Sequence, residues 1–161
     1  VWAYSGCLMG RGFDEPGEKG FVLLDTDTPS FEFVPFAEHE VIIKEIDIRA
    51  ASNAQDAWII VSAALENISN KQKHMLKVEL IGDITFDSVN ERLEEIIAEA
   101  IRGFFFHKVE NKTRRKYSFN DYIGQNSLPG EFVGLVMSDK SLDEDTKNEI
   151  MNLGLSRLLN N

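Results

Sequence analysis

Cysteine is almost absent from this sequence of 161 residues, since Cys7 is the only one. An intrachain disulfide is therefore excluded, and the composition fits a reducing compartment. No apolar run approaches the roughly 20 residues that a membrane-spanning helix needs. No segment near the start has the charged, apolar and cleavage regions of a secretory signal peptide. We therefore expect a cytoplasmic protein that does not enter a membrane.

Histidine is also scarce, and its placement argues against a metal centre. His39, His74 and His107 are far apart in the sequence, and none has a partner at the spacing of a metal ligand. Asp25 and Asp27 form a D-x-D pair, but they lie in a stretch rich in turn residues, so we interpret them as turn residues rather than metal ligands. The sequence predicts no catalytic and no metal-binding residue.

A nucleotide-binding loop is disfavoured as well. Gly12 and Gly17 have the spacing of a phosphate-binding G-x-x-x-x-G-K-[ST] loop. However, Glu18 takes the place of the lysine, and Gly20 does not supply the hydroxyl that would hold magnesium. Residues 21–24 then predict a strand, whereas a phosphate-binding loop opens a helix.

Charge is strongly unbalanced along the chain. The net charge is −10, which argues against a free-standing nucleic-acid-binding protein. Residues 102–116 nevertheless hold six basic residues and one acidic residue, a net charge of +5. Such a basic strip can contact DNA phosphates, which position DNA without reading its sequence. A solvated rim of the fold explains the strip equally well.

Hydrophobic periodicity predicts the secondary structure. Extended segments are expected at residues 2–9, 21–24, 31–36, 41–49 and 76–80, and from Phe104 onwards. Three S-x-x-E/Q capping boxes, at Ser52, Ser88 and Ser141, predict the starts of three helices. Trp58 and Val89 are assigned to the apolar faces of the first and second helices. Residues 120–140 are rich in glycine and proline, and we predict them to be mostly irregular.

These elements predict a mixed fold, α+β or α/β, in three parts. Residues 1–38 give an antiparallel hairpin that cannot bury its own apolar surface. Residues 40–119 give a two-layer strand-helix-strand-helix-strand domain with both helices on one face of the sheet. Residues 120–161 give a loop and a C-terminal helix.

The opening stretch "YSGCLMGRGFDEPGEKGFVLLD" resembles the end of the phosphoesterase domain of bacterial SbcD-like DNA repair exonucleases, and in particular their YhaO-type branch. In that family a Y-x-G-s strand precedes a G-R-x-F-x-E-x-G-x-K-G loop. The matching residues are Tyr4, Gly6, Gly10, Arg11, Phe13, Glu15, Gly17, Lys19 and Gly20. The motif covers about twenty residues of this chain. Over the rest of the chain the resemblance is one of architecture.

The resemblance implies a parent enzyme of the metallophosphoesterase superfamily that hydrolyses phosphodiester bonds with two manganese or similar divalent ions. The family's ligand motifs, D-x-H, G-D-x-x-D, G-N-H-[DE] and G-H-x-H, do not occur in this sequence. Because the first residue is valine, we expect a fragment of a longer protein. The resemblance implies that it is the C-terminal part of the parent enzyme, for which a homodimer is one of the expected states. Residues 1–38 would be the last strands of its phosphoesterase β-sandwich, and residues 40–119 its capping domain.

Two sets of candidate binding residues follow. The DNA-binding candidates are Lys108, Lys112, Arg114, Arg115, Lys116, Arg11 and Lys19. For Arg11 and Lys19 we favour ion pairs with nearby acidic residues over contacts with DNA phosphates. The resemblance also implies docking of an SbcC-like coiled-coil ATPase on the C-terminal helix, through Ile150, Leu153, Leu155, Leu158 and Leu159. The alternative for this helix is that it folds back onto the capping domain. The alternative for the whole chain is a small-ligand-binding or dimerisation module unrelated to nucleases.

Overall fold

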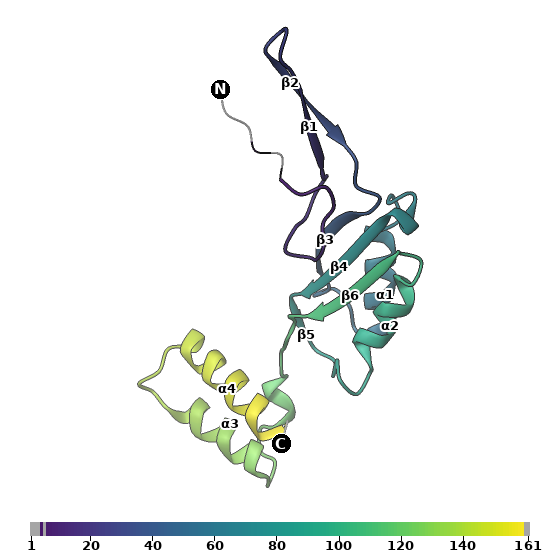
Figure 1. The fold of residues 1–161 in the computed structure, drawn as a ribbon. Helices are drawn as coiled ribbons and strands as arrows, with labels where there is room; N and C mark the ends of the chain where they lie inside the picture. The colour runs from purple at the N-terminus through teal and green to yellow at the C-terminus, as the bar shows by residue number, and fades with distance from the viewer. Residues whose placement is uncertain (1–3, 5, 160–161) are drawn as a thin grey trace.

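The computed structural model describes Tyr4 and residues 6–159, and its fold is mixed α and β (Figure 1). An antiparallel hairpin, a three-stranded parallel sheet with two helices, and a pair of helices follow one another along the chain. The strands are β1 (Gly20–Asp25), β2 (Ser30–Pro35), β3 (Glu40–Asp47), β4 (His74–Ile81), β5 (Asp83–Ile84), β6 (Phe106–Asn111) and β7 (Arg114–Arg115). The helices are α1 (Ala54–Ala64), α2 (Leu93–Ala100), α3 (Leu128–Ser138) and α4 (Glu144–Leu159), with short 3₁₀ turns at Lys71–Lys73 and Phe119–Asp121.

The β1–β2 hairpin confirms the two strands predicted around residues 21–36. Gly20 lies opposite Pro35 at its open end, and Asp25 lies opposite Ser30 at the turn. The Asp25 carboxylate accepts hydrogen bonds from the backbone N–H groups of Asp27 and Thr28, which confirms turn chemistry for the D-x-D pair. The strand predicted at residues 2–9 is wrong where it can be checked, because Tyr4 and residues 6–9 belong to no strand. Residues 1–3 and 5 lie outside the described part of the chain.

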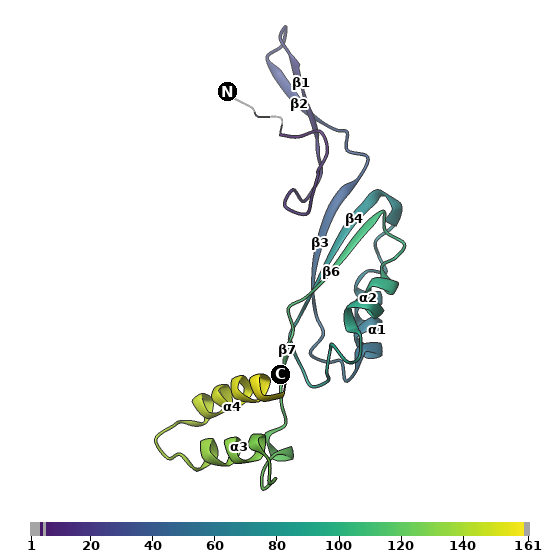
Figure 2. The ribbon, with the colours of Figure 1, turned by 60° about the horizontal axis from the view of Figure 1, so that its bottom comes forward.

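The central α/β unit has the predicted strand-helix-strand-helix-strand order. Its sheet is parallel with strand order β3-β4-β6, and α1 and α2 cover the same face (Figure 2). Leu76, Val78 and Leu80 of the central strand point to the helices and are completely buried. Two parallel crossovers of the same hand place both helices on one side, which leaves the other face of the sheet without a helical layer.

Helix α1 begins one residue later than its predicted capping box. Asn53, not Ser52, is the N-cap residue, and its side-chain oxygen accepts from the Asp56 N–H at 2.9 Å. The Ala54 N–H is satisfied by the Glu91 carboxylate at 2.7 Å. The sequence assigned Glu91 to the start of the second helix, whereas the fold uses it to cap the first one. Trp58 lies on the outer side of α1 and is 36% exposed.

Helix α2 also begins later than predicted. The Asp87 carboxylate accepts from the N–H groups of Val89 and Asn90, which makes residues 87–90 a turn instead of a first helical turn. The chain then passes through Arg92 in the left-handed region, at φ 52°, before the helix starts at Leu93. Val89 is therefore 81% exposed and not part of the apolar face.

Residues 120–140 contain a helix that the sequence prediction missed. Ser127 caps α3, because its hydroxyl accepts from the Gly130 N–H at 3.3 Å, and Pro129 stands in the first turn. Proline is favoured at that position, since the amide it lacks would have no intrahelical partner. The sequence predicts an irregular segment here because proline and glycine usually break helices. In the structure, Pro129 and Gly130 instead lie in the first turn of a helix.

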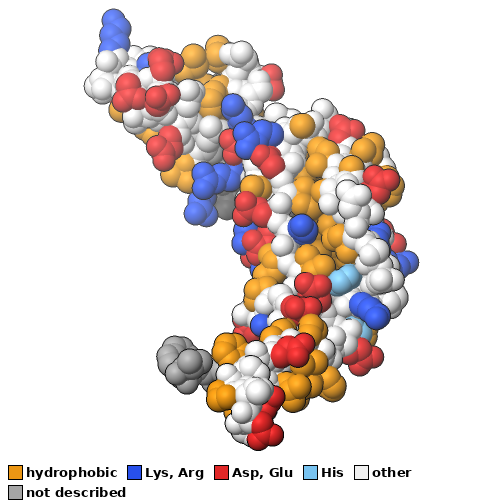
Figure 3. All heavy atoms as spheres, turned by 90° about the horizontal axis from the view of Figure 1, so that it is seen from above, with side chains coloured by type: hydrophobic (Ala, Val, Ile, Leu, Met, Phe, Trp, Pro, Cys, Tyr) orange, Lys and Arg blue, Asp and Glu red, His pale blue; other side chains and the backbone are white. Residues whose placement is uncertain are grey.

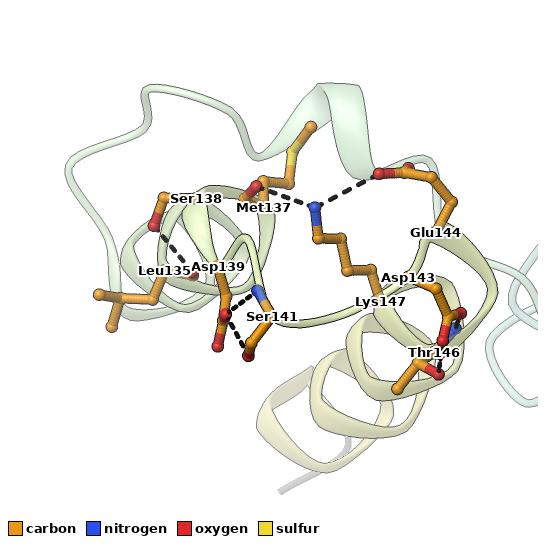
Figure 4. Close-up of polar contacts among 9 residues, drawn as sticks. All are labelled: Leu135, Met137, Ser138, Asp139, Ser141, Asp143, Glu144, Thr146 and Lys147. Carbon is orange, nitrogen blue, oxygen red and sulfur yellow. Dashed lines mark hydrogen bonds and ion pairs between the residues drawn. The ribbon is translucent and has the colours of Figure 1, made fainter.

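The turn between α3 and α4 is fixed by side chains of its own (Figure 4). Asp143, not Ser141, stands at the start of α4, and its carboxylate accepts from the N–H and the hydroxyl of Thr146 at 2.8 and 2.9 Å. The Ser141 hydroxyl donates to Asp139 instead. The Lys147 ammonium donates across the turn to the Met137 carbonyl at 3.3 Å, so it connects the two helices.

Helices α3 and α4 form a second core, separate from the core of the α/β unit. This core consists of Tyr117, Val133, Met151 and Leu155, with Phe132 packed against it. A Cβ atom on Gly154 would lie 2.2 Å from the Phe132 ring, so this glycine allows close approach of α4 to α3. Helix α4 contacts the predicted capping domain at the end of that domain, through Tyr117. Its main partner is α3, and the pair stands below the sheet in Figure 2.

Candidate functional site

Strands β5 and β7 extend the sheet at its carboxyl end. Gly82, at φ 107°, turns the chain after β4. Asp83 then lies opposite Arg114, and Ile84 lies opposite Arg115 in a short parallel pair. The basic residues Arg114, Arg115 and Lys116 are therefore held on an ordered backbone at the edge where open α/β sheets usually bind ligands.

A groove of 1220 Å³ lies between this extension and helix α4. Residues 113–117 and the turn at residues 87–90 line one side. Asn148, Asn152 and Leu153 of α4 line the other. The Asn152 side chain accepts from the Tyr117 N–H at 3.3 Å, which joins the two walls of the groove. The groove thus brings together one end of the predicted basic strip and part of the predicted partner-binding helix.

The three basic residues of the groove differ in their surroundings. Arg115 pairs with Asp87 at 2.7 Å and lies over the Tyr117 ring, 5.1 Å from its centroid. The pKa of Asp87 is held below its ordinary value by the Asn90 N–H and by the charge of Arg115. Arg114 and Lys116 are exposed and have no ion-pair partner within the described chain. They are the two groove cations whose charge is not paired with a carboxylate of the described residues.

The other half of the basic strip lies on a different surface. Lys108 is beside Lys77 in the β4–β6 register, on the sheet face opposite the helices. Lys112 pairs with Glu79 at 2.6 Å, and Lys77 bridges Glu79 and Glu110 at 2.5 and 2.6 Å. Hydrogen bonds from Lys112 and Lys77 hold the pKa of Glu79 below its ordinary value. The predicted DNA-binding residues are therefore divided between two surfaces. In the view of Figure 3, basic and acidic side chains are interspersed.

Arg11 and Lys19 do not form the ion pairs that we preferred. The Arg11 backbone N–H donates to Glu15 at 3.0 Å, and the Lys19 ammonium donates to the Pro16 carbonyl at 3.1 Å. Neither side chain has a carboxylate partner within 4 Å among the described residues. The loop that holds them contacts the α/β unit through Gly17, whose N–H donates to the Val41 carbonyl at 3.1 Å.

The five predicted partner-binding residues of α4 also have different environments. Leu155 is completely buried against α3 and is not available to a partner, which corrects that assignment. Leu153 and Leu159 are 63% and 39% exposed, while Ile150 and Leu158 are half-buried. On α3, Leu128 and Leu135 are 66% and 72% exposed and were not predicted. Their i, i+7 spacing places them on one face of a helix and could have indicated an exposed apolar surface. The sequence analysis does not use this spacing, because it predicts residues 120–140 to be mostly irregular.

The β1–β2 hairpin exposes apolar side chains on both faces. One face carries Val22, Leu24, Phe31 and Phe33, and the other carries Phe21, Leu23 and Val34. Leu24 and Phe31 are 65% and 58% exposed. Hydrophobic side chains lie open at the surface around this end of the molecule (Figure 3). Strands that are apolar on both faces are typical of the interior of a packed sheet.

No grouping of three or more His, Cys, Asp or Glu side chains within residue 4 and residues 6–159 is suited to hold a metal ion. Among the helices of the same residues, none combines the length and apolarity required to cross a membrane. No protein-family model matches the sequence, and the search of curated proteins gives no match.

Proposed function

We propose that this chain is the non-catalytic capping region of a metal-dependent DNA exonuclease, acting in the cytoplasm in DNA repair. In this proposal the α/β unit lies over the cleft of a preceding catalytic domain and limits which DNA ends enter. The two C-terminal helices dock a coiled-coil ATPase. The sequence motif of residues 4–20 is the source of the family assignment, and three features of the structure support it.

The exposed apolar hairpin is the observation that carries the proposal. An isolated two-stranded hairpin is marginally stable in water, and exposing aromatic residues on both faces adds to its cost. Preceding strands of a phosphoesterase β-sandwich would cover the face formed by Leu24, Phe31 and Phe33. Strand β2 of the hairpin is followed closely by β3, and the loop at residues 10–17 contacts β3 through the Gly17 N–H and the Val41 carbonyl, so the capping unit would be attached directly to the sandwich.

The groove supports a contact with the DNA backbone. Arg114 and Lys116 are exposed, adjacent to one another on β7 and its extension, and without carboxylate partners in the described chain. Such cations contact phosphates and position DNA without reading its sequence. Asp83, Asp87 and Glu149 also line the groove, so these two residues are expected to make a local contact rather than to form a large positive surface.

The helical pair supports a partner contact. Leu135 on α3 and Leu153 on α4 are exposed although the pair has its own core. An amphipathic helix pair with unused apolar side chains fits a groove at the base of a coiled coil. The residues proposed for this contact are Leu128, Leu135, Leu153 and Leu159, of which Leu153 and Leu159 also line the groove.

Catalytic metal ions would not bind to the residues described here. The family implies two manganese ions, but no suitable cluster of ligands is present in this part of the chain. We therefore assign their binding to the preceding catalytic domain, and the role of this chain is to bind and orient the substrate. Addition of manganese to the isolated chain with double-stranded DNA is expected to give no cleavage.

The DNA contact is tested by Arg114→Glu/Lys116→Glu in the longer protein that contains this chain. Affinity for double-stranded ends should fall, and the slope of log K against log salt should decrease by about 2, since each lost phosphate contact removes about 0.9. Lys44→Glu/Lys140→Glu, at two exposed lysines outside the groove, is the control for the same change of net charge. Unchanged affinity and slope in Arg114→Glu/Lys116→Glu would refute the DNA contact.

The partner contact is tested by Leu135→Glu and Leu153→Glu. Co-purification with the coiled-coil ATPase should be lost while the melting temperature stays within about 2 °C, because surface substitutions change stability little. Retained co-purification would exclude this surface as the docking site.

A small-ligand-binding regulatory module is the second candidate, and the size of the groove favours it. The reading frame upstream of Val1 separates the two functions. If the four metal-ligand motifs are absent from the roughly 250 residues upstream, a typical domain length, the exonuclease proposal fails and the regulatory module is retained. If the motifs are present, the regulatory module is rejected.

A further inference from the structure

Strand β6 forms an unpaired edge of the parallel sheet. It pairs with β4 on one side, and no strand lies beyond it in Figures 1 and 2. The Lys112 N–H donates to the Leu80 carbonyl at 2.8 Å, so the even-numbered residues direct their backbone groups to β4. Because successive residues of a strand alternate, the N–H and C=O groups of His107, Val109 and Asn111 point outward. They have no backbone partner among the described residues.

The side chains along this edge have opposite charges at alternate positions. Lys108 and Glu110 both lie on the sheet face away from the helices. Lys108 is exposed and has no ion-pair partner in the described chain. Glu110 pairs with Lys77, which itself is shared with Glu79. Lys108 and Glu110 are two residues apart on this open edge. If a second copy is placed antiparallel by a two-fold rotation, the lysine of each copy can face the glutamate of the other.

We propose that β6 pairs with β6 of a second copy of this chain, antiparallel and centred on Val109. This pairing would make a continuous six-stranded sheet, parallel within each copy and antiparallel at the centre. The backbone groups that point outward would form three hydrogen-bonded residue pairs: Val109 with Val109, and His107 with Asn111 twice. Lys108 of each copy then lies opposite Glu110 of the other, in the non-hydrogen-bonded positions where side chains are closest.

The charge pattern selects this register over its neighbours. Residues that lie opposite one another in paired strands must point to the same face of the sheet. Even-numbered residues of β6 can therefore pair only with even-numbered residues of the second copy, and the two-fold axis must pass through a residue. Centring on Lys108 places two lysines opposite one another. Centring on Glu110 places two glutamates opposite one another and Lys108 opposite Lys112. Like charges directly opposite are destabilising, whereas the register centred on Val109 contains none.

The interaction is independent of the proposed nuclease function, since it uses neither the groove nor the helical pair. The expected partner is an identical chain because the charge order and the backbone pattern of β6 are complementary to themselves under a two-fold axis. The interface formed by one six-residue strand is small, so the dimer should be weak and dependent on protein concentration.

The test is a charge-exchange experiment on the chain of residues 1–161, followed by analytical ultracentrifugation up to about 100 µM, where weak dimers are visible. Lys108→Glu and Glu110→Lys should each raise the dissociation constant at least tenfold, because each places like charges opposite one another twice. An equimolar mixture of the two variants should associate at least as tightly as the wild type, since every pair is then opposite in charge. Lys140→Glu, which changes the net charge away from β6, should leave the dissociation constant unchanged.

A crosslinking measurement determines the register even if Glu110→Lys, which removes the Lys77 ion pair, fails to fold. In a Cys7→Ser background, Lys108→Cys and Glu110→Cys chains are mixed and mildly oxidised. Heterodimers joined by a disulfide are expected to exceed Lys108→Cys homodimers at least tenfold, because positions 108 and 110 are directly opposite. A monomeric wild type, unchanged dimerisation of Lys108→Glu, or preferential 108–108 or 110–110 crosslinking would each overturn the proposal.

Discussion

Gly154→Ala is predicted to destabilise the helical pair although alanine is the better helix former. Gly154 lies inside α4, where replacing glycine by alanine normally gains about 1 kcal/mol. Here the new methyl carbon would stand 2.2 Å from Cζ and 2.4 Å from Cε1 of Phe132. Carbon atoms in contact normally lie about 3.5–4 Å apart, so the ring or the helix has to move by more than about 1 Å.

The size of the effect follows from two opposing contributions. Forcing an extra methyl group into a packed interface costs about 1–3 kcal/mol. Subtracting the gain in helix propensity leaves a net destabilisation of about 1 kcal/mol, with an upper limit of about 2 kcal/mol. In a Phe132→Ala background the ring is absent, so Gly154→Ala should stabilise by about 1 kcal/mol. The coupling between the two positions is therefore about 2 kcal/mol.

Gly134→Ala provides a matched control within the same pair of helices. Gly134 is also helical, but a Cβ atom there has no neighbour within 4 Å. The substitution should therefore stabilise α3 by about 1 kcal/mol. The same chemical change is thus expected to have opposite signs on two facing helices.

Native-state hydrogen exchange of peptides from α3 and α4 is the suitable assay, because it reports local stability in a chain with two cores. Slower exchange in α4 after Gly154→Ala, in the presence of Phe132, would refute the reasoning. A destabilisation of the same size in the Phe132→Ala background would also refute it, since the effect would then not arise from the ring.

Three further predictions concern the caps, the second core and the pH dependence. Asn53→Ala should destabilise α1 by about 1 kcal/mol and Ser52→Ala by less than about 0.5 kcal/mol in urea unfolding, whereas the reverse order would support the capping box at Ser52. Leu155→Ala should cost about 2–5 kcal/mol because the side chain is completely buried, whereas Leu153→Ala, at an exposed position, should cost less than about 0.5 kcal/mol. Hydrogen exchange in α4 measures both, and equal costs would contradict the assignment of core and surface. Because the pKa of Glu79 is lowered in the folded state, the folded state binds fewer protons than the unfolded state near the ordinary value of 4.5. The stabilisation by ionised Glu79 is therefore present above that pH and is lost as the pH falls through the folded-state pKa. The melting temperature should therefore fall as the pH drops below about 5, and by less in Glu79→Gln; identical pH profiles would exclude this role.

The sequence predicted the α/β unit because its periodicity and its packing agree. Leu76, Val78 and Leu80 alternate with charged residues, and the same alternation divides the two faces of β4 in the structure. The β1–β2 hairpin was predictable for a related reason, since Asp25 and its neighbours form a turn through local hydrogen bonds. Local chemistry and local sequence are sufficient for elements of this kind.

The helix starts were less predictable because several polar residues compete for each cap. Ser52 and Asn53 are adjacent, and both are good N-cap residues. The choice of Asn53 is accompanied by a contact from Glu91, which lies 37 residues from Ala54 and satisfies the Ala54 N–H. Helix α3 was missed because proline and glycine break helices in most positions but are compatible with a first turn.

The sequence by itself determined the two hairpin strands, the strand-helix-strand-helix-strand order of the central unit and the position of the basic strip. Only the tertiary structure decided which of those basic residues share a surface. Lys108 and Lys112 lie on the open sheet face, and Arg114 and Lys116 line a groove closed by α4. The physical reason is that strand alternation and the turn at Gly82 act locally, whereas the wall of the groove depends on a helix that packs through a core over 30 residues further along the chain.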